Sequence, residues 1–591
     1  MITLGLVEAV DDNGVYVVMP GSRGVLRGPY ETAIQVVAGE RVLLVETDDG
    51  QQVVAGALGA AGDVSVKAFG ARGDSITDDS AAFQSALDAA AGASVTVPSG
   101  VYHLTDTVDI PADTSLKMCP GADLRPDNPE QTAFTLASGS SLQGGKITSA
   151  ELWDGTNTSW TYAVVRVEGD GASVRDVSLV NVPRVGIGVD EADDVVISGC
   201  RIYGGYTTDL WNSDNTASVH FGIAYDPGVG DTRGNFQVTE CLVKDCVQAM
   251  YIGNYGTGDW ARGVVITGNV FEGCHNHGIY AEYTSGATIT GNTFNRCCGS
   301  VVAGLASVVS GNTMITRDTG EDKDRPQISM RNPTGCVVSN NTIRGEGTDG
   351  SVVIDLSPLH GDTERSECRD NVVTGNTVDI SSGTVRGIRV GSGEMTSCDD
   401  NVVRGNIVKV AGSESLGVIT VGDPAQPGAG NDISGNTVVI RGASNGIQLF
   451  EQVGARLIGN EIRLEYDADD ATNICLIALV DSTGTVIAGN RLVVTSAFGD
   501  NVSVYGVWEN GSTAYSEIEP NPSSYDMTKL SAAQHLSLLS GTGVAQVHET
   551  GTGAPGFPAG VGSIYRRRDG GAATTLYVKE SGTGNTGWVA K

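Results

Sequence analysis

A recurring strand phrase places polar side chains at a fixed distance behind a Gly-Ile pair, in a pattern suited to general acid and base chemistry. The phrase and its aligned variant occur at Gly186-Ile187, Gly222-Ile223, Met250-Tyr251 and Gly278-Ile279. Four residues after the first member of each pair stand Asp190, Asp226, Asn254 and Glu282. Successive side chains of a strand point to opposite faces, so inward-pointing isoleucines place these polar groups on the outer face. The sequence therefore predicts a polar column on one outer face.

Asp226 and Glu282 are the predicted catalytic pair of this column. Neighbouring strands of a sheet lie about 4.8 Å apart, so carboxylates on the first and third of three stacked strands have backbones roughly 9.6 Å apart. Inverting glycosidases hold their two carboxyl groups about 6.5–9.5 Å apart, whereas retaining enzymes need about 5–5.5 Å. If the pair acts on a glycosidic bond, this spacing favours inversion over retention, with Asp259 as the reserve member of the pair.

The neighbours of the two carboxyl groups suggest different roles for them. Tyr280 and Tyr283 flank Glu282, and partial burial against aromatic rings raises the pKa of a carboxyl group. Glu282 is therefore the expected general acid. Asp226 is followed by Pro227-Gly228 in an expected loop, where it should stay ionised and serve as the base.

Substrate-binding side chains are expected around this pair. Asn254 is suited to hold a water molecule or a hydroxyl group, and aromatic rings beside acids suit the C–H faces of sugars. The further candidates are Tyr280, Trp211, Trp260 and His277. An alternative stays open, because the outer faces of stacked strands are polar in any case, and an acidic column in a chain of net charge −33 needs no function.

Other kinds of reactive site have little support in the sequence. There is no G-x-S-x-G elbow, no H-E-x-x-H pair and no P-loop. Asp467, Asp469 and Asp470 lack the glycine and the distal glutamate of an EF-hand calcium loop. The eleven cysteines form no C-x-x-C pair and are expected to be reduced and mostly buried. We expect no metal and no cofactor.

A second repeated phrase supplies the elements that must position these side chains. Short runs of β-branched residues end in Gly-Asn or a close variant, and from Asn269 onward they recur every 20–35 residues. The repeats end at Cys200, Asn269, Asn292, Asn312, Asn341, Asn376, Asn406, Asn436, Asn460 and Asn490. Gly and Asn tolerate positive φ, so each phrase predicts a strand followed by a sharp bend. Short strands at this period, without amphipathic helices between them, predict a parallel β-helix in which one repeat forms one coil.

Composition excludes several classes of protein. The 591 residues include 81 Gly without a G-X-Y period, which excludes collagen, and 40% hydrophobic residues suffice for a core. A net charge of −33 repels nucleic acid phosphates and anionic lipid, so neither is an expected partner. The sequence contains no run of about 18 apolar residues, so no membrane span is expected. Residues 1–8 lack the features of a secretory signal, so folding in a cytosol is expected.

A helix-and-strand segment precedes the repeats. Phe69–Leu87 predicts a turn and an amphipathic helix with Asp78 or Asp79 as N-cap, and Val95–Tyr102 continues as strands. Together with the Gly-Asn repeats, this wording resembles the pectate-lyase-like right-handed β-helix superfamily found in phage tailspikes, over about residues 65–510. The resemblance implies an all-β, right-handed parallel β-helix whose helix caps the first coil. It also implies a homotrimeric virion protein of the tail tip, assembled in the host cytoplasm.

Four segments are expected along the chain. Residues 1–60 have the strand and turn pattern of a small antiparallel barrel and resemble OB-like modules of phage tail proteins. That resemblance implies attachment to a tail or baseplate protein. Residues 63–510 are the expected β-helix, 511–540 a linker with a short helical stretch, and 541–591 a β-hairpin module. The last module resembles terminal modules of phage structural proteins and is expected at the tip of the trimer.

The function implied by the resemblance is recognition and endo-acting hydrolysis of a bacterial capsular or cell-wall polysaccharide. Two alternatives remain open from the sequence. A receptor-binding spike without catalysis needs the same aromatic surfaces but no paired acids. A polysaccharide lyase instead uses an Arg or Lys base, with or without Ca²⁺, and leaves a carbon–carbon double bond in its product.

Overall fold

The computed structural model consists of two compact units, Met1–His275 and Asn276–Lys591. The structure describes residues 2–11, 14–18, 26–30, 40–46, 52–60, 63–128, 132–149, 163–204, 220–228, 234–253, 260–316, 326–331, 333–347, 351–357, 367–383, 385–392, 396–410, 417–424, 427–442, 445–465, 473–494, 503–510, 517–518, 523–525, 536–540, 548–556, 561–582 and 584–591.

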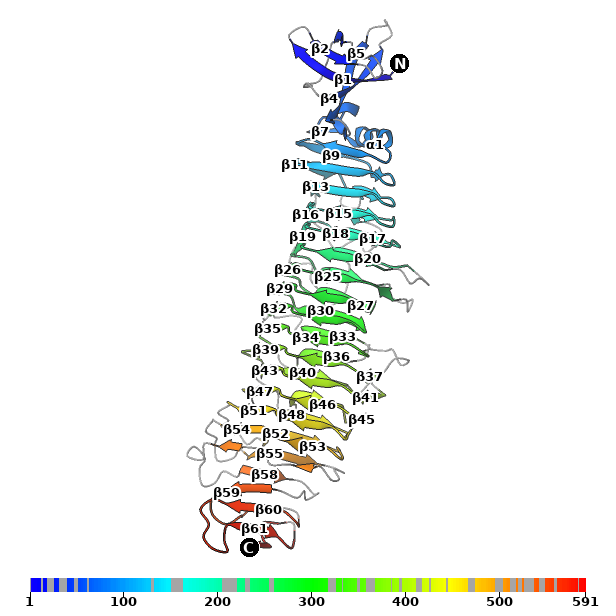
Figure 1. The fold of residues 1–591 in the computed structure, drawn as a ribbon. Coiled ribbons are helices and arrows are strands. Elements are labelled where there is room, and N and C mark those ends of the chain that lie inside the picture. The colour runs from blue at the N-terminus through cyan, green and yellow to red at the C-terminus, as the bar shows by residue number, and fades with distance from the viewer. Residues whose placement is uncertain are drawn as a thin grey trace. The chain divides into compact units, whose positions relative to one another are not determined.

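Within residues 2–60, the five described strands form one antiparallel sheet in the order β3-β2-β1-β4-β5. The strands are β1 (Ile2–Asp11), β2 (Gly14–Val18), β3 (Leu26–Tyr30), β4 (Glu40–Glu46) and β5 (Gln52–Ala60). The predicted barrel-like module is thus a five-stranded antiparallel sheet, and it is shown at the blue end of Figure 1.

The rest of the first unit is a stack of coils whose strands pair in parallel with those of the next coil (Figure 1). A sheet that we call face A takes strands from successive coils: β10 (Val108–Ile110), β12 (Phe134–Leu136), β14 (Ala163–Val167), β17 (Val185–Asp190), β20 (Phe221–Asp226), β23 (Gln248–Ile252) and β24 (Ala261–Arg262). Face B contains β6 (Asp63–Ser65), β8 (Ser94–Val97), β15 (Ser173–Arg175), β18 (Val196–Ser198), β21 (Gln237–Thr239) and β25 (Val265–Thr267). Face C contains β7 (Asp74–Asp78), β9 (Gly100–Leu104), β16 (Ser178–Val182), β19 (Arg201–Gly204), β22 (Leu242–Lys244) and β26 (Val270–Glu272). The long strands β11 (Ser115–Pro126) and β13 (Ser141–Thr148) run through faces B and C.

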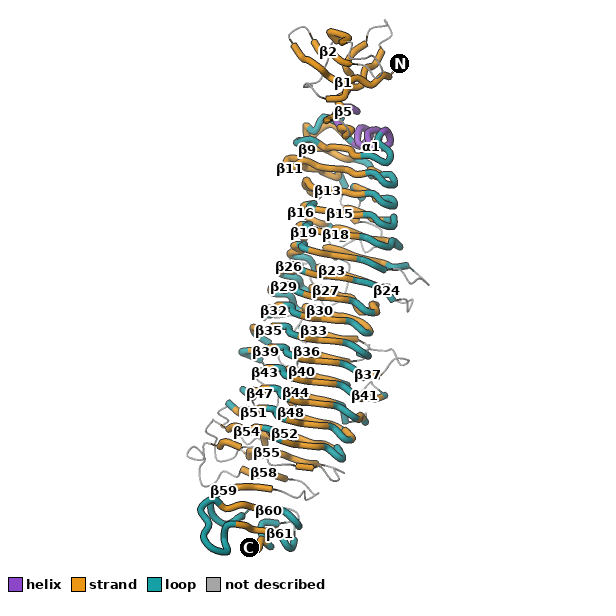
Figure 2. Tube along the Cα trace, in the orientation of Figure 1, coloured by secondary structure: helices purple, strands orange, loops and turns teal. Residues whose placement is uncertain are grey.

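The second unit repeats the same three faces. Its face A contains β27 (His277–Ser285), β30 (Gly299–Leu305), β33 (Ile328–Arg331), β36 (Val352–Ser357), β40 (Arg386–Val390), β44 (Gly417–Val421), β48 (Asn445–Phe450), β52 (Asn473–Val480), β55 (Ser503–Asn510) and β58 (Leu536–Ser540). Face B contains β28 (Thr288–Thr290), β31 (Val308–Ser310), β34 (Val337–Ser339), β38 (Val372–Thr374), β42 (Val402–Arg404), β46 (Asp432–Ser434), β50 (Arg456–Ile458), β53 (Val486–Ala488) and β56 (Glu517–Ile518). Face C contains β29 (Thr293–Asn295), β32 (Thr313–Ile315), β35 (Thr342–Gly345), β39 (Thr377–Ile380), β43 (Ile407–Val410), β47 (Thr437–Ile440), β51 (Glu461–Leu464), β54 (Arg491–Val494) and β57 (Ser523–Tyr525). Two short pairs join neighbouring coils, β37 (Glu367–Arg369) with β41 (Ser397–Asp399) and β45 (Gly428–Ala429) with β49 (Gln452–Val453). Figure 2 shows the loops that link the strands of each coil.

A ladder of aliphatic side chains fills the interior behind face A of the second unit. Its members are register partners on successive strands and are 0–3% exposed: Ile279, Val301, Ile328, Ile354, Ile388, Ile419, Ile447, Ile477 and Val507. Each fully buried aliphatic side chain contributes about 1.5–3 kcal/mol of transfer free energy. The isoleucine of the Gly-Ile phrase is thus a core residue, as its pattern predicts.

The glycine of that phrase is required by close approach of the opposite wall. A Cβ atom at Gly387 would lie 2.1 Å from Cγ1 of Val408 on face C, and one at Gly278 would lie 2.5 Å from Cδ1 of Phe294. Both distances are far below a van der Waals contact, so a larger residue would displace the core.

The two residues of the Gly-Asn repeat have different roles in the structure, whereas the sequence predicted that both serve the bend. The residue before the buried asparagine takes the left-handed bend, for example Gly405 at φ +63°, Gly435 at φ +61° and Asn340 at φ +54°. The asparagine is buried and forms a ladder of amides that runs through Asn292, Asn312, Asn341, Asn376, Asn406, Asn436, Asn460 and Asn490. Each Nδ2 donates to the Oδ1 of the next asparagine at 2.9–3.1 Å. The repeat thus holds each coil to the next through side chains as well as backbone.

Helix α1 (Ser80–Ala89) covers the first coil. It buries Phe83, Ala86 and Leu87. The Gln84 side chain donates to the Asp109 carbonyl and accepts from the Asp109 amide, so it closes the free edge of β10.

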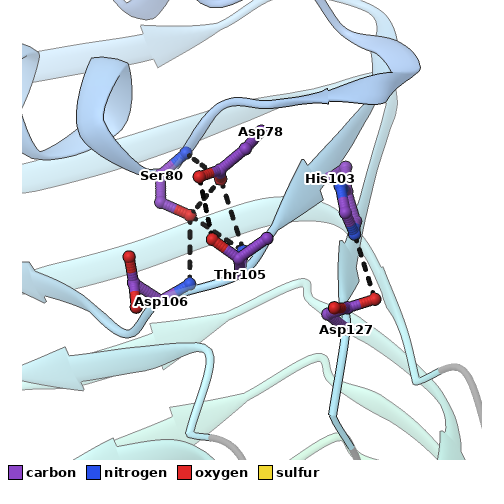
Figure 3. A network of polar contacts seen from close by, with 6 residues as sticks. All are labelled: Asp78, Ser80, His103, Thr105, Asp106 and Asp127. Atoms are coloured by element: carbon purple, nitrogen blue, oxygen red, sulfur yellow. Dashed lines mark hydrogen bonds and ion pairs between the residues drawn. The ribbon is translucent and has the colours of Figure 1, made fainter.

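The side chain that caps α1 is Asp78, whereas Asp79 instead binds the amides of Arg72 and Gly73. Figure 3 shows how the Asp78 carboxylate accepts from Ser80, while the Ser80 hydroxyl accepts from the Thr105 and Asp106 amides. These bonds fix the start of the helix to the turn after β9. The capping helix expected from the sequence is therefore present.

The coils continue further toward the C-terminus than the sequence predicts. Residues 511–540 were expected to form a linker with a short helix, but they supply β56, β57 and β58, which pair in parallel with β53, β54 and β55. The reason is that short strands at this period need no Gly-Asn phrase once a preceding coil offers its hydrogen-bonding edge. The C-terminal module is a separate sheet of β59 (His548–Gly551), β60 (Ile564–Arg567), β61 (Leu576–Lys579) and β62 (Trp588–Ala590), with two antiparallel pairings.

All eleven cysteines carry free thiols, and nine of them are buried. Within the described ranges, no helix has the length and apolar character needed to cross a bilayer.

Candidate functional site

The residues predicted to form the site fall in three groups. Asp226 ends β20 in the first unit, whereas Glu282, Tyr280 and His277 lie on β27 in the second. Trp260 is half-buried just before β24. Trp211, Asn254 and Asp259 lie outside the described residues. The pairing of Asp226 with Glu282 joins residues of two units and stays a prediction.

In the first unit the structure places Asp226 level with a second carboxylate, Asp190, on the neighbouring strand β17. Arg166 Nη2 donates to Asp190 Oδ2 at 2.5 Å, which compensates that charge. Asp226 Oδ1 accepts a hydrogen bond from the Gly228 amide at 2.9 Å. Burial, together with the charges of Asp190 and Glu191, nevertheless raises the pKa of Asp226. This shift opposes the expectation that Asp226 stays ionised as freely as a loop carboxylate.

The predicted column is out of register at its third member. The sequence alignment set Tyr251 level with Ile223, but the structure pairs Met250 with Ile223 and Tyr251 with Ala224. Met250 therefore takes the core position and is fully buried. The next partner pair is Tyr225 with Ile252, which makes Gly253 rather than Asn254 the position level with Asp226. The error arises because this coil has Met in place of Ile, so no Gly-Ile phrase marks its register.

In the second unit Glu282 lies in an irregularity of face A. Ala281 pairs with Ala303 and Ser285 with Leu305, so three residues of β27 face the single Gly304 of β30. Such bulges re-aim side chains and are common beside active sites. Thr284 closes the bulge by donating its hydroxyl to the Ala281 carbonyl at 2.6 Å.

Glu282 is held in a dry and aromatic environment. Its side chain is only 4% exposed, and the Tyr280 hydroxyl donates to its Oε2 atom. The His277 and Tyr280 rings meet edge to face, with centroids 5.2 Å apart. Burial raises the pKa of Glu282, while the Tyr280 hydroxyl and the charge of Arg331 offset part of this rise. The arrangement favours a carboxyl group that keeps its proton above the usual pH range.

A polar chain continues from Arg331 along face A of the second unit. Arg331 Nη1 donates to the Ser357 hydroxyl at 3.2 Å, and that hydroxyl donates to Asp355 Oδ2 at 3.1 Å. Asp355, 2% exposed, receives a bidentate pair from Arg389, through Nε to Oδ1 and Nη2 to Oδ2, both at 2.7 Å. Paired hydrogen bonds of this kind fix orientation as well as charge. The outer face thus carries a connected set of charged groups beside Glu282.

The outward position after each core isoleucine is polar over several successive coils. Its register partners are Ser329, Asp355, Arg389, Thr420 and Gln448, which we call the polar row. All except Arg389 are at most 4% exposed. Among the residues that the structure describes, none forms a hydrogen bond with the Ser329 hydroxyl or with Gln448 Oε1. Buried polar atoms without a partner are rare in proteins and often mark a place that a ligand or water completes.

Sequence reasoning missed the polar row. Arg386-Gly387-Ile388-Arg389 repeats the Gly-Ile phrase, so extending the alignment beyond Gly278 would have placed Arg389 on the outer face. No such signal exists for Arg331 or Asp355, since their coils lack the phrase and the repeat length varies.

Over the described ranges, no group of three or more His, Cys, Asp or Glu side chains is arranged to hold a metal ion. Asp467, Asp469 and Asp470 lie outside those ranges.

Comparisons with known proteins concern the coils. A family model described as a right handed beta helix region matches residues 162–313 and 255–462, which together span more than half of the chain. No curated protein sequence matches the chain.

Solved structures with detectable likeness include three of different kinds. PfbA, a surface adhesin of Streptococcus pneumoniae, is 14% identical at a TM-score of 0.41, over 89% of this chain and 98% of that chain. ORF18 of Geobacillus virus E2 is 14% identical at a TM-score of 0.38, over 55% of this chain and 66% of that chain. DFA-IIIase from Arthrobacter chlorophenolicus A6, without its lid, is 13% identical at a TM-score of 0.40, over 57% of this chain and 93% of that chain.

The parallel coils, their inward aliphatic ladder and the extent of the family match lead to one assignment. This chain belongs to the right-handed β-helix family.

Proposed function

We propose that the chain binds a bacterial surface polysaccharide on the outer side of face A and hydrolyses it, with Glu282 as general acid. The observation that carries this proposal is the state of Glu282, buried in a bulge with a raised pKa and next to Tyr280. A general acid must hold a proton at working pH and release it to the leaving oxygen. Tyr280 is half-buried and supplies an aromatic ring beside the acid for a sugar unit.

Asp226 is the proposed base that activates water, and Asp259 is the reserve member. The raised pKa of Asp226 supports a role in proton transfer, because a catalytic base works best with a pKa near the operating pH. An inverting mechanism is part of this proposal and rests on the spacing expected of stacked strands.

The test compares Glu282→Gln and Asp226→Asn with the wild type on host capsule or cell-wall glycan. Each variant should lose several orders of magnitude in turnover while its glycan binding is kept, because shape is conserved and only the proton or charge is removed. Glu272→Gln is a matched control, since Glu272 is ion-paired with Lys244 on face C. Near-normal turnover in both variants would remove this site from consideration.

Product analysis separates the two other functions. Ultraviolet absorbance of the digest would indicate a lyase, and retention of anomeric configuration would exclude inversion. Binding without any cleavage would indicate a receptor-binding spike.

We also propose that the chain is a tailspike at the tip of a phage tail, assembled in the host cytoplasm as a homotrimer. The proposal rests on the resemblance of residues 65–510 to tailspike β-helices. The sheet of residues 2–60 supports a separate module for docking to a tail or baseplate protein. The C-terminal sheet of β59–β62 is the proposed trimer tip.

A further inference from the structure

Ser357 lies in the middle of a chain of hydrogen bonds that joins three successive strands of face A in the second unit. Its hydroxyl accepts from Arg331 Nη1 at 3.2 Å and donates to Asp355 Oδ2 at 3.1 Å. Arg389 holds that carboxylate through two hydrogen bonds of 2.7 Å. Ser357 and Asp355 are 3% and 2% exposed, so water does not compete for these bonds. The buried carboxylate therefore fixes the Ser357 hydroxyl, and that hydroxyl fixes one end of the Arg331 guanidinium.

Arg331 lies level with the proposed general acid, two coils away from it. Glu282 and Arg331 each follow a member of one register set, which is Ala281, Ala303 and Met330. The residue between them on β30 is Gly304, which has no side chain. The backbones of Glu282 and Arg331 are thus two strand spacings apart, about 9.6 Å, a gap that two long side chains can close. Burial raises the pKa of Glu282, and the positive charge of Arg331 opposes that rise.

The groups around Glu282 make Arg331 the charge that matters there. On β27 itself the Tyr280 hydroxyl donates to the carboxylate, and the His277 ring packs against Tyr280. Strand β30 has no titratable side chain, and β33 contributes Arg331 as its charged side chain. Within the described ranges, Arg331 is therefore the charged residue that acts on Glu282. A general acid becomes a carboxylate once its proton has passed to the leaving oxygen, and a fixed positive charge stabilises that carboxylate.

We propose that Ser357, anchored by Asp355, is a positioning residue that holds the Arg331 guanidinium beside Glu282. The inference rests on the proposed function, and it adds the device that sets the protonation of the acid. A guanidinium presents its donors in a rigid fork, so a bond at one end restricts the direction of the whole group. Without the Ser357 hydroxyl, the long side chain of Arg331 regains rotamers that carry its charge away from the carboxyl group.

The test follows the protonation of Glu282 in the full chain and needs no substrate. Infrared spectra are recorded over a range of pH for each protein and for the same protein with Glu282→Gln. The difference isolates the carbonyl band of the protonated Glu282 side chain. The variants are Arg331→Gln, Ser357→Ala, Ser357→Thr, and Ser357→Ala combined with Arg331→Gln. Ser339→Ala is the matched control, because the buried Ser339 side chain donates to another serine, Ser310, at 2.9 Å on face B.

Arg331→Gln should raise the pH at which Glu282 loses its proton by about 1 pH unit, because a stabilising charge is lost. Ser357→Ala should raise it by a smaller amount. Ser357→Thr, which keeps the hydroxyl, and Ser339→Ala should leave it unchanged. Ser357→Ala should add no further rise to that of Arg331→Gln, since the serine acts through the arginine. On a glycan that the chain cleaves, the alkaline limb of the kcat profile should move together with the band.

A Glu282 band that titrates alike in the wild type and Ser357→Ala would overturn this inference. So would a further rise when Ser357→Ala is combined with Arg331→Gln. A thermal midpoint several degrees lower in Ser357→Ala, with the titration unchanged, would show that the serine serves stability alone. If the chain binds and cleaves no glycan while the titration moves as expected, the proposed function is wrong and the positioning of Arg331 stands.

Discussion

Tyr280 controls the protonation of Glu282 from two positions away on the same strand. Its hydroxyl donates to the carboxylate form, which lowers the pKa that burial has raised. Arg331 acts in the same direction through its charge. The protonation state of the proposed acid is thus a balance between burial and two neighbours, Tyr280 and Arg331, rather than a property of burial alone.

Tyr280→Phe should raise the pKa of Glu282 further, because the carboxylate loses a donor while the burial stays. A general acid is active when protonated, so the alkaline limb of the kcat profile should move to higher pH. The measurement is a pH–rate profile on a cleaved glycan. Tyr505→Phe, on β55, serves as control and should leave the limb in place. A limb that moves to lower pH would contradict the assignment.

His220 is a buried histidine whose role is structural. Its Nε2 lies 2.9 Å from the Val182 carbonyl and its Nδ1 accepts from the Val247 amide at 3.2 Å, so it ties three coils together. Accepting at Nδ1 requires a neutral ring with its proton on Nε2. Burial, with the nearby charge of Arg184, lowers the pKa of His220 from 6.5 to about 4.

Stability should therefore fall as pH drops from about 6.5 to about 4. Below its unfolded pKa the free histidine binds a proton that the folded one refuses, so the unfolded state gains. The shift corresponds to about 3 kcal/mol in total. Urea unfolding at several pH values measures it for the wild type and His220→Gln. The variant should be less stable at pH 7 and lose this part of the pH dependence, and an unchanged dependence would show that other groups cause it.

At the scale of elements, the sequence predicted the coils because the Gly-Asn phrase recurs every 20–35 residues. Two local rules of the Gly-Ile phrase explain why each coil folds as it does. The isoleucine of the Gly-Ile phrase must be buried, and its glycine must pass close to the opposite wall, as at Gly387. Both rules act within one coil. What joins coils was less predictable, since pairing of Met250 with Ile223 depends on register between strands and not on either strand alone.

The site was less predictable than the fold for the same reason. Arg331, Ser357 and Asp355 come from two strands in different coils and meet only after stacking. Because the repeat length varies, the sequence does not show that these residues lie close together. The asparagine ladder was also missed, because a Gly-Asn pair is equally compatible with a sharp bend and with a buried amide.

The ladder asparagines should be among the costliest positions to replace. Asn406 accepts from the amide and the Nδ2 of Asn376, and donates to Asn436 and to the Val373 carbonyl. Asn406→Leu leaves these buried groups without partners, at on the order of 3–5 kcal/mol. Denaturant unfolding measures the loss, and Asn295→Ala, at a half-buried position on β29, should cost far less. Similar losses of stability in both variants would show that the asparagine ladder does not contribute specially to the stability of the fold.

At the scale of the whole molecule, the proposed homotrimer predicts the mass of the particle in solution. Light scattering of the purified chain at micromolar concentration should give three times the chain mass of 61.0 kDa. Deleting residues 541–591 should impair trimer formation more than the folding of the coils, because β59–β62 form a sheet of their own. A monomer mass for the full chain would contradict the trimer, and normal trimer yield from the shortened chain would contradict the tip.

Removal of the first module tests the proposed attachment. A chain starting at Asp63 keeps β6, which pairs with β8 in the first coil, and loses only the antiparallel sheet. It should retain glycan binding and cleavage but fail to join virions. Glycan activity lost together with that sheet would show that the module belongs to the site.

The asparagine ladder also bears on how such a protein changes size over generations. Asn406 and Asn436 occupy equivalent rungs, so in-frame loss of residues 407–436 would let Asn406 face Asn460 directly. A second set of stacked amides contains Asn401, Asn431 and Gln452, in which Asn401 donates to Asn431 and Asn431 donates to Gln452. Because Asn431 is among the residues lost, Asn401 would then face Gln452 directly. The second unit would become shorter by one strand spacing, about 4.8 Å, with no orphaned amide. Genetic gain or loss of single repeats is therefore a route by which the length of this unit can evolve in small equal steps.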